Sequence, residues 1–325
     1  MNKSHELLQL QKVFGFFAAE HATKSERPDF IIEISKAMKL GVEVTSIYKN
    51  NIDAKLRNVP DYQSSLLEGN GTIHRNDRGN FDLDDIEIID QDGNHVAKAK
   101  AIIQQVPTMK ERIDSLFSVI RVKEDKVNEY LKRCEYVDLI IKDESNLFLH
   151  KSHGQFHESF HKLASKIELL SSNFREIYLV TTTNDNQEVF YPLRANFFVS
   201  DCFAYVSLIT SKRNSISFKE LFELLSACLL LEGYTGIKTS LRDSVVSFFA
   251  GAWEMRYSIE GHVIRDWRLV VERYNGELIE TANARNQPNI IKKAKRLVAK
   301  RALLYSAAEV RFPVEQADEP LAPSF

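Results

Sequence analysis

The chain has only three cysteines among its 325 residues, and they lie far apart: Cys134, Cys202 and Cys228. An odd number outside any C-x-x-C spacing argues against a disulfide framework and a zinc knuckle, and favours a reducing, cytoplasmic compartment. Long apolar runs are also missing, because the longest, residues 227–231, is far too short to span a bilayer. Residues 1–10 are interrupted by charged side chains and lack the apolar core of a secretion signal. We therefore expect a soluble cytoplasmic protein with no membrane partner.

Charge of one sign is not in excess either. The 43 Lys and Arg residues against 45 Asp and Glu residues leave a net charge of −2. Without a global basic field, any binding to nucleic acid has to come from a local patch. What the chain does contain is apolar material, since 44% of its residues are hydrophobic. That is enough for two domains with ample core.

The first 195 residues alternate between helical and strand patterns. Residues 4–22 place leucines and phenylalanines at helical spacing behind a serine cap. Two apolar or β-branched runs, residues 30–34 and 40–48, are separated by a short polar turn and predict a hairpin. Helices and strands then alternate at residues 109–133 (helix), 136–141 (strand), 156–171 (helix) and 177–182 (strand). This order predicts an α/β fold with a mixed central sheet flanked by helices.

Two further regions complete the predicted organisation. Residues 50–105 are polar and are interpreted as an insertion that ends in a hairpin of residues 86–89 and 95–103. Residues 196–312 predict a second, α+β domain, and residues 313–325, rich in proline and acids, are expected to be disordered. The predicted elements of the second domain are a strand at 197–209, a helix at 218–231, strands at 252–259 and 263–274, and a helix at 290–307.

Two carboxylates occupy the first predicted hairpin. Asp29 follows Pro28 at the start of one strand, and Glu43 lies between Val42 and Val44 on the other. Paired strands place neighbouring side chains about 5 Å apart, close enough to share one ion, and carboxylate oxygens suit Mg²⁺ and Mn²⁺. A glutamate buried between valines is costly unless a positive charge compensates it. The pair predicts a metal site, although Pro-Asp also commonly starts a strand and a glutamate at a sheet edge can face solvent.

With Glu20 on the helix before them, Pro28-Asp29 and Glu43-Val44-Thr45 resemble the short motif of the PD-(D/E)XK nuclease superfamily. The resemblance implies a restriction-endonuclease-like core, made of a helix, a three-stranded meander, a helix and a fourth strand. It also implies metal-dependent hydrolysis of phosphodiester bonds in nucleic acid, and a role in genome defence is consistent with it. Asp29 and Glu43 would be the catalytic ligands of Mg²⁺ or Mn²⁺, with the Val44 carbonyl and Glu20 as further metal ligands.

Thr45 stands where the family has a lysine that positions or activates water. In some members the following helix supplies this cation instead. Here Lys123 lies among the apolar residues of the predicted 109–133 helix, so its amine is expected to point toward the sheet. Lys126 flanks the same face and is the second candidate for the catalytic lysine. Thr45 also supports an alternative, a catalytically inactive nucleic-acid-binding protein with the same fold.

A competing motif, H-E-x-x-H, occurs at His157, Glu158 and His161. On a helix it would place two imidazoles on one face to bind Zn²⁺, with the glutamate as general base of a peptidase. Such a site needs a third protein ligand, for which Glu176 and Glu188 are only weakly placed candidates. A zinc peptidase is therefore kept as an alternative, beside the simpler interpretation of histidines on the shoulder of an amphipathic helix.

The last predicted helix has a basic face that could contact phosphates, or could simply be solvated. We expect the substrate to be DNA rather than RNA, and the second domain to recognise substrate or to form a homodimer. The candidate nucleic-acid-binding residues are Lys292, Lys293, Lys295, Arg296 and Lys300.

Overall fold

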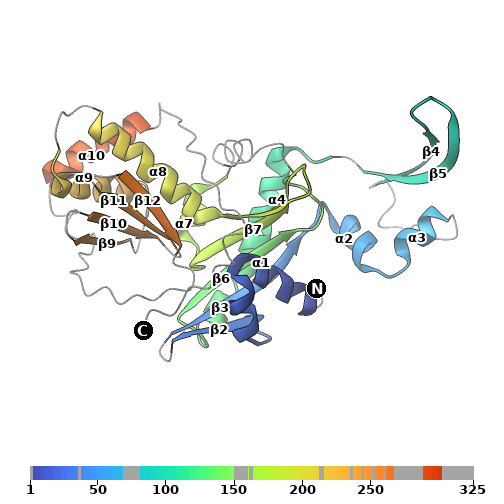
Figure 1. Ribbon diagram of the computed structural model, residues 1–325, viewed down its shortest axis with the longest axis horizontal. Coiled ribbons are helices and arrows are strands. Elements are labelled where there is room, and N and C mark those ends of the chain that lie inside the picture. Colours follow the sequence, from blue (N-terminus) through green and yellow to red (C-terminus); the bar gives the residue numbers. More distant parts are fainter. Residues whose placement is uncertain are drawn as a thin grey trace.

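A computed structural model describes residues 3–35, 38–68, 81–104, 106–149, 160, 164–211, 216–234, 237–242, 245–250, 253–258, 261–266 and 288–301. Within these residues the chain is an α/β protein built on a mixed six-stranded sheet flanked by helices (Figure 1). The strands lie in the order β1-β2-β3-β6-β7-β8. Their bounds are β1 (Ala22–Lys24), β2 (Phe30–Ser35), β3 (Met38–Ile47), β6 (Tyr136–Asp143), β7 (Glu176–Thr182) and β8 (Glu188–Pro192).

Strand directions divide this sheet into an antiparallel and a parallel part. The strands β1, β2 and β3 form an antiparallel meander after the helix α1 (Lys3–His21), which confirms the predicted hairpin. Along the chain, the helix α4 (Met109–Glu124) comes after β3 and before β6. In the sheet, β3 and β6 are neighbours and pair in parallel. β7 then pairs in parallel with β6, and β8 closes the edge antiparallel to β7.

Alternation along β3 sends neighbouring side chains to opposite faces of the sheet. Val42 and Val44 join a hydrophobic cluster that includes Leu10 and Val13 of α1. On the other face, Leu116 of α4 packs in a second cluster with sheet residues. Glu43 lies between the two valines and therefore points toward the α4 face.

The predicted strand at residues 197–209 is wrong, because this segment belongs to the helix α8 (Leu193–Thr210). Eight consecutive residues, 195–202, are buried, so the helix is covered on most of its circumference. An apolar run without a polar face carries no period that distinguishes a buried helix from a buried strand. The predicted domain boundary at residue 195 also falls inside α8, whose side chains pack in the same cluster as those of α1 and β3.

The rest of the second half combines two helices with a small sheet. α9 (Phe218–Leu231) and α10 (Pro288–Arg301) are helical as predicted, although residues 302–307 lie outside the described part. The sheet is antiparallel, in the order β12-β11-β10-β9, and its strands β9 and β10 were not predicted. The bounds are β9 (Lys238–Arg242), β10 (Val245–Ala250), β11 (Trp253–Ser258) and β12 (Gly261–Asp266).

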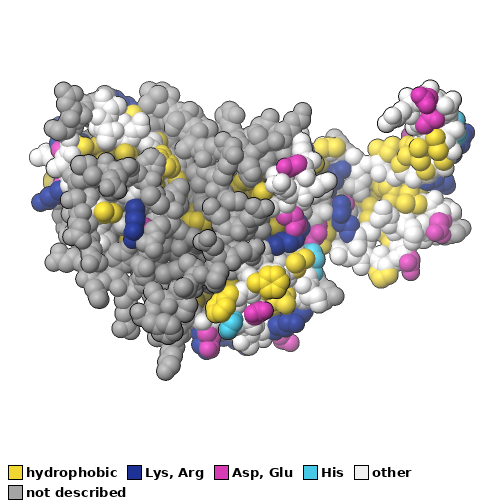
Figure 2. Space-filling model, viewed as in Figure 1, with side chains coloured by type: hydrophobic (Ala, Val, Ile, Leu, Met, Phe, Trp, Pro, Cys, Tyr) yellow, Lys and Arg dark blue, Asp and Glu magenta, His cyan; other side chains and the backbone are white. Residues whose placement is uncertain are grey.

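The insertion is a separate small unit beside the main sheet. Its helices α2 (Asn51–Asn58) and α3 (Tyr62–Leu67) share a small hydrophobic cluster with Phe81. The ribbon of β4 (Asp82–Ile89) and β5 (His95–Ile103) extends away from the body (Figure 1). Exposed hydrophobic side chains gather on this ribbon in Figure 2, among them those of residues 86, 88, 89, 96 and 103.

Two predicted helices differ from the structure in extent. The predicted helix at 109–133 divides into α4 and α5 (Val127–Tyr130), with a turn at residues 125–126. Of the predicted 156–171 helix, α7 (Lys166–Ser171) is described, whereas residues 156–159 and 161–163 are not. Residues 313–325 also lie outside the described part. Of the helices that the structure describes, none combines the length and apolar character needed to cross a membrane.

Gly41 on β3 allows the chain to pass close to the start of β2. A Cβ atom at this position would lie 2.7 Å from Cys134 Sγ and 2.7 Å from Pro28 Cγ. Both distances are well inside van der Waals contact, so any side chain here would push Pro28 away from the strand. Asp29 follows Pro28 directly, so the position of Asp29 depends on the absence of a side chain at Gly41.

We expect Gly41→Ala to lower the free energy of unfolding by about 1–3 kcal/mol, the usual cost of overpacking a well-packed core. Urea denaturation of the wild-type and variant proteins measures this loss. In a Cys134→Ala background the same substitution should cost less, because one of the two clashing atoms is gone. A Gly41→Ala protein as stable as the wild type would contradict the proposed close packing.

Candidate active site

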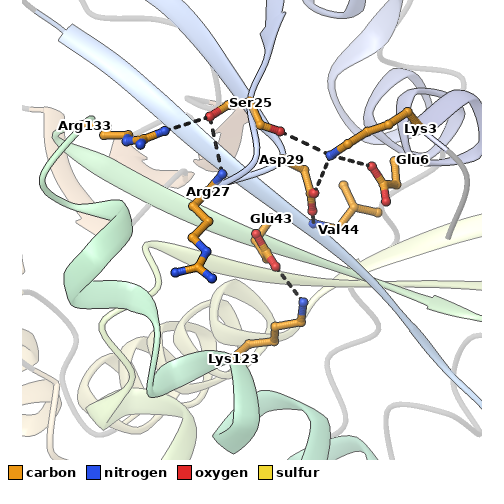
Figure 3. Close-up of polar contacts among 9 residues, drawn as sticks. All are labelled: Lys3, Glu6, Ser25, Arg27, Asp29, Glu43, Val44, Lys123 and Arg133. Atoms are coloured by element: carbon orange, nitrogen blue, oxygen red, sulfur yellow. Dashed lines mark hydrogen bonds and ion pairs between the residues drawn. The ribbon is translucent and has the colours of Figure 1, made fainter.

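Asp29 and Glu43 lie opposite each other at the beginning of β2. The antiparallel register pairs Phe30 with Val42, and extending it by one residue pairs Asp29 with Glu43. The negative charge of Asp29 is accordingly one of the causes that raise the pKa of Glu43. Figure 3 shows the two carboxylates beside each other.

A backbone hydrogen bond fixes the Asp29 side chain. The N–H of Val44 donates to Asp29 Oδ2 at 2.9 Å. The pairing of β3 with β2 ends at Phe30 and Val42, so the N–H of Val44 has no backbone partner on β2. The Asp29 carboxylate satisfies this N–H instead. The predicted role of Val44 was through its carbonyl, whereas the contact present here uses its N–H. The second oxygen of Asp29, Oδ1, accepts a hydrogen bond from Lys3 Nζ.

Glu43 is buried and faces a lysine from α4. Lys123 Nζ donates to Glu43 Oε1 at 2.6 Å, and the side chains of Glu43 and Lys123 are 6% and 18% exposed. Burial raises the pKa of Glu43, and the hydrogen bond from Lys123 counteracts part of this shift. The nearby Tyr130 hydroxyl also favours the charged carboxylate, yet no donor in the described part of the chain meets Glu43 Oε2 with hydrogen-bond geometry.

Lys3 provides a second cation at the same place. Its ammonium donates to Asp29 Oδ1 at 2.8 Å and to the Ser25 carbonyl at 3.2 Å, and it lies 3.1 Å from Glu6 Oε2 (Figure 3). Burial lowers the pKa of Lys3, but the hydrogen bonds to Asp29 and Glu6 outweigh burial, so the pKa is raised. Each of the two opposed carboxylates therefore has its own lysine partner.

Glu20 and Lys126 are not among the contacts of this cluster. Glu20 is exposed near the end of α1, and Ala22 pairs with Ile32, so Glu20 lies toward the opposite end of β2 from Asp29. Lys126 is exposed at the turn before α5, and no contact described for Glu43 involves it.

Glu6 is the acid that α1 brings to the cluster, and the prediction missed it. It belongs to the buried stripe of the helix, four residues before Leu10 and seven before Val13. This position is the same signal that singled out Lys123, a charged residue at an apolar position of an amphipathic helix. Lys3 lies three residues before Glu6 and carried no such signal, because its pairing with Asp29 is tertiary.

Two arginines lie at the rim of the site. Arg133 Nη1 donates to the Ser25 hydroxyl at 3.3 Å, and Arg27 Nη1 donates to the exposed Glu129 at 3.0 Å. Both arginines are exposed. Burial raises the pKa of Tyr130, and the positive charge of Arg27 opposes part of this rise. Two exposed positive charges therefore lie beside Asp29 and Glu43 (Figure 3).

The zinc motif at His157, Glu158 and His161 lies outside the described residues. Its two candidates for a third ligand are engaged elsewhere. Glu176 accepts backbone N–H groups from the start of α8 and from β7 on both of its oxygens, and burial raises its pKa to about 7. Glu188 is paired with Lys12 and Lys142.

The basic residues of α10 are exposed as one face of that helix. Its opposite face, with Ala294 and Leu297, packs on the hydrophobic cluster of α8 and α9. Lys293 lies 3.4 Å from Glu220 of α9. The exposed members are the five predicted residues, Lys292, Lys293, Lys295, Arg296 and Lys300.

The carboxylate oxygens at the sheet are of the type that binds hard divalent cations. Two opposed carboxylates supply oxygens, and Glu43 Oε2 is buried without a hydrogen-bond donor in the described chain. The part of the chain that is described has no group of three or more His, Cys, Asp or Glu side chains arranged to hold a metal, so the remaining ligands would be backbone oxygen, water or substrate. In comparisons with known proteins, no protein-family model, curated protein or solved structure matches the chain.

Lys123→Met should destabilise the protein in a pH-dependent way. Because burial raises the pKa of Glu43 above its ordinary value of 4.5, the folded carboxyl keeps its proton to higher pH than the unfolded one, and ionisation above that range costs stability. Lys123 opposes this shift, so its removal raises the pKa further. We expect Lys123→Met to lower the free energy of unfolding only slightly at about pH 5 and by about 3 kcal/mol at about pH 8.

Urea denaturation across this pH range, with Lys132→Met as the control, measures the effect. Lys132 is an exposed lysine beyond α5, and its removal should change stability little at any pH. Adding Glu43→Gln to Lys123→Met should remove the pH dependence. A loss that is the same at every pH would show that the ion pair does not control Glu43.

Proposed function

We propose that this chain is a Mg²⁺- or Mn²⁺-dependent nuclease with a restriction-endonuclease-like core that cleaves phosphodiester bonds in DNA. The observation that carries the proposal is the contact between Lys123 and Glu43. Where the motif lacks its lysine, at Thr45, the helix after the meander delivers an ammonium group 2.6 Å from the second acid. A lysine at an apolar position of α4 has no other contact among the described residues that would explain it as well.

The order of elements supports the same proposal. The chain runs from a helix through a three-stranded antiparallel meander and a helix to a strand parallel to the third strand. Asp29 precedes the second strand of this meander and Glu43 lies on the third. Both positions agree with the motif that the sequence resembles, and the insertion of α2, α3, β4 and β5 falls between the third strand and the following helix.

Asp29 and Glu43 are the residues that would hold the metal. A bound Mg²⁺ would supply charge neutralisation at the scissile phosphate and a lowered pKa of the attacking water. Within the chain itself, Lys123 holds a positive charge against Glu43 Oε1 and can orient water or a phosphate oxygen at that point. Val44 fixes Asp29 through its N–H, and Arg27 and Arg133 attract the phosphate backbone toward the acids.

A catalytically inactive nucleic-acid-binding protein is the second candidate. It is favoured by the fact that Lys3 and Lys123 each neutralise one of the two acids. A site that no longer binds metal would keep these ion pairs as its final state. Cleavage and binding measured on the same proteins separate the two functions.

Purified full-length protein should cleave plasmid DNA in Mg²⁺ or Mn²⁺, and single-stranded DNA and RNA serve as parallel substrates. Asp29→Asn, Glu43→Gln and Lys123→Met should each lower the rate by about 100-fold or more, because the first two weaken a metal ligand and the third removes the ammonium group beside it. Gel analysis of the products over time gives the rates.

Glu33→Gln and Lys132→Met are the matched controls for this assay. Both are exposed charges on the neighbouring elements, and both should leave the cleavage rate unchanged. If the wild type cleaves none of the three substrates but binds DNA, the inactive binding protein is the correct assignment. Cleavage that persists in all three site variants would contradict the assigned site.

The basic face of α10 should contribute to DNA binding. Replacing Lys292 and Lys295 by alanine should weaken binding and reduce the slope of log K against log salt by about 0.9 for each phosphate that is no longer neutralised. Fluorescence anisotropy at several salt concentrations measures both quantities. Lys98 and Lys100 on the β4–β5 ribbon are also exposed, and their double alanine variant is the control that should leave the slope unchanged.

A further inference from the structure

We propose that the Lys3 ammonium occupies the place of a divalent cation, so that metal binding at Asp29 requires Lys3 to leave. The inference rests on the proposed function and concerns the regulation of the same site. Lys3 would act as a tethered cation that competes with Mg²⁺ or Mn²⁺ and sets the metal concentration at which the site fills.

The surroundings of the Lys3 ammonium are three oxygen atoms from three different positions in the chain. They are Asp29 Oδ1 at 2.8 Å, Glu6 Oε2 at 3.1 Å and the Ser25 carbonyl at 3.2 Å. Two carboxylates and a carbonyl are the ligand types that hard divalent cations prefer. They come from α1, from the loop after β1 and from the residue before β2, and they converge only in the folded chain (Figure 3).

The acids are fixed, whereas the lysine can move. The side chains of Glu6 and Asp29 are 9% and 13% exposed, but that of Lys3 is 44% exposed. A hydrogen bond from Val44 holds Asp29, so the carboxylate cannot follow a departing partner. Lys3 can place its ammonium in water at small cost, because a half-exposed lysine remains well solvated.

The charge of the cluster favours this exchange. Glu6, Asp29 and Glu43 carry three negative charges against the two positive charges of Lys3 and Lys123, so one negative charge is uncompensated. A divalent cation in place of the Lys3 ammonium would bring the cluster to neutrality. Buried carboxylates in excess are costly, and a second positive charge therefore stabilises them.

Unsatisfied polar atoms in the same region point to a missing ligand. Glu43 Oε2 is buried and meets no donor of the described chain with hydrogen-bond geometry, although the Tyr130 hydroxyl lies near this carboxylate. Gln9, on the same buried stripe of α1 as Glu6, is fully buried with neither amide atom paired to a described residue.

Mn²⁺ binding to the full-length protein tests the inference, with the free ion measured by electron paramagnetic resonance. Lys3→Met should lower the dissociation constant for Mn²⁺ by about tenfold, a coupling typical of two ligands that exclude each other. Lys12→Met is the matched control, because Lys12 is also a lysine of α1 that pairs with an acid, Glu188, away from this site. It should leave Mn²⁺ affinity unchanged.

Thermal unfolding provides a second readout that does not depend on cleavage. Without metal, Lys3→Met should unfold at a lower temperature than the wild type, and saturating Mn²⁺ should raise its transition by more than that of the wild type. Lys3→Gln, with a polar side chain at the same position, should behave in the same way and replaces Lys3→Met if the latter does not fold.

The outcomes separate this inference from the proposed function. If Lys3→Met and Lys3→Gln bind Mn²⁺ no more tightly than the wild type while Asp29→Asn weakens binding, Lys3 is only a latch and the inference is overturned, but the metal site stands. If Asp29→Asn leaves Mn²⁺ affinity unchanged in both the wild-type and the Lys3→Met background, the metal site itself is wrong.

Discussion

The burial of Glu43 on the central sheet is the constraint on which the site depends. A carboxylate at this depth is stable only when a cation meets it, because water cannot solvate its charge. α4 supplies that cation from the other side of the α4–sheet interface, and Lys123 reaches Glu43 across it. The contact fixes the rotation of α4 about its axis, since a charged side chain on its apolar stripe must point at the acid.

The same site combines fixed acids with a buried lysine, Lys123, and a half-exposed lysine, Lys3. Glu43 is held by its strand, and Asp29 is held by the N–H of Val44 at the point where β2 begins. Both lysines reach the acids from helices, through long side chains. The proposed exchange of Lys3 with a metal ion depends on this division, because the carboxylates keep their arrangement when the lysine leaves.

Close packing between the start of β2 and β3 positions the Asp29 carboxylate. Gly41 has no side chain and lets Pro28 lie against β3. Asp29 is the next residue after Pro28, so the position of its carboxylate depends on a glycine that is itself not part of the site. Two exposed arginines, Arg27 and Arg133, lie beside the site.

The sequence by itself determined the hairpin of β2 and β3, the two acids on it and the lysine on α4, because each is a local pattern of alternation or helical period. It did not determine α8, whose side chains are buried nearly all round and so lack a period, and on the first helix it singled out Glu20 and missed Glu6. Only the tertiary structure decided which end of α1 meets β2, and hence that Lys3 and Glu6 belong to the site. Such pairings join residues more than twenty positions apart, and no local pattern records how a helix is placed against a sheet.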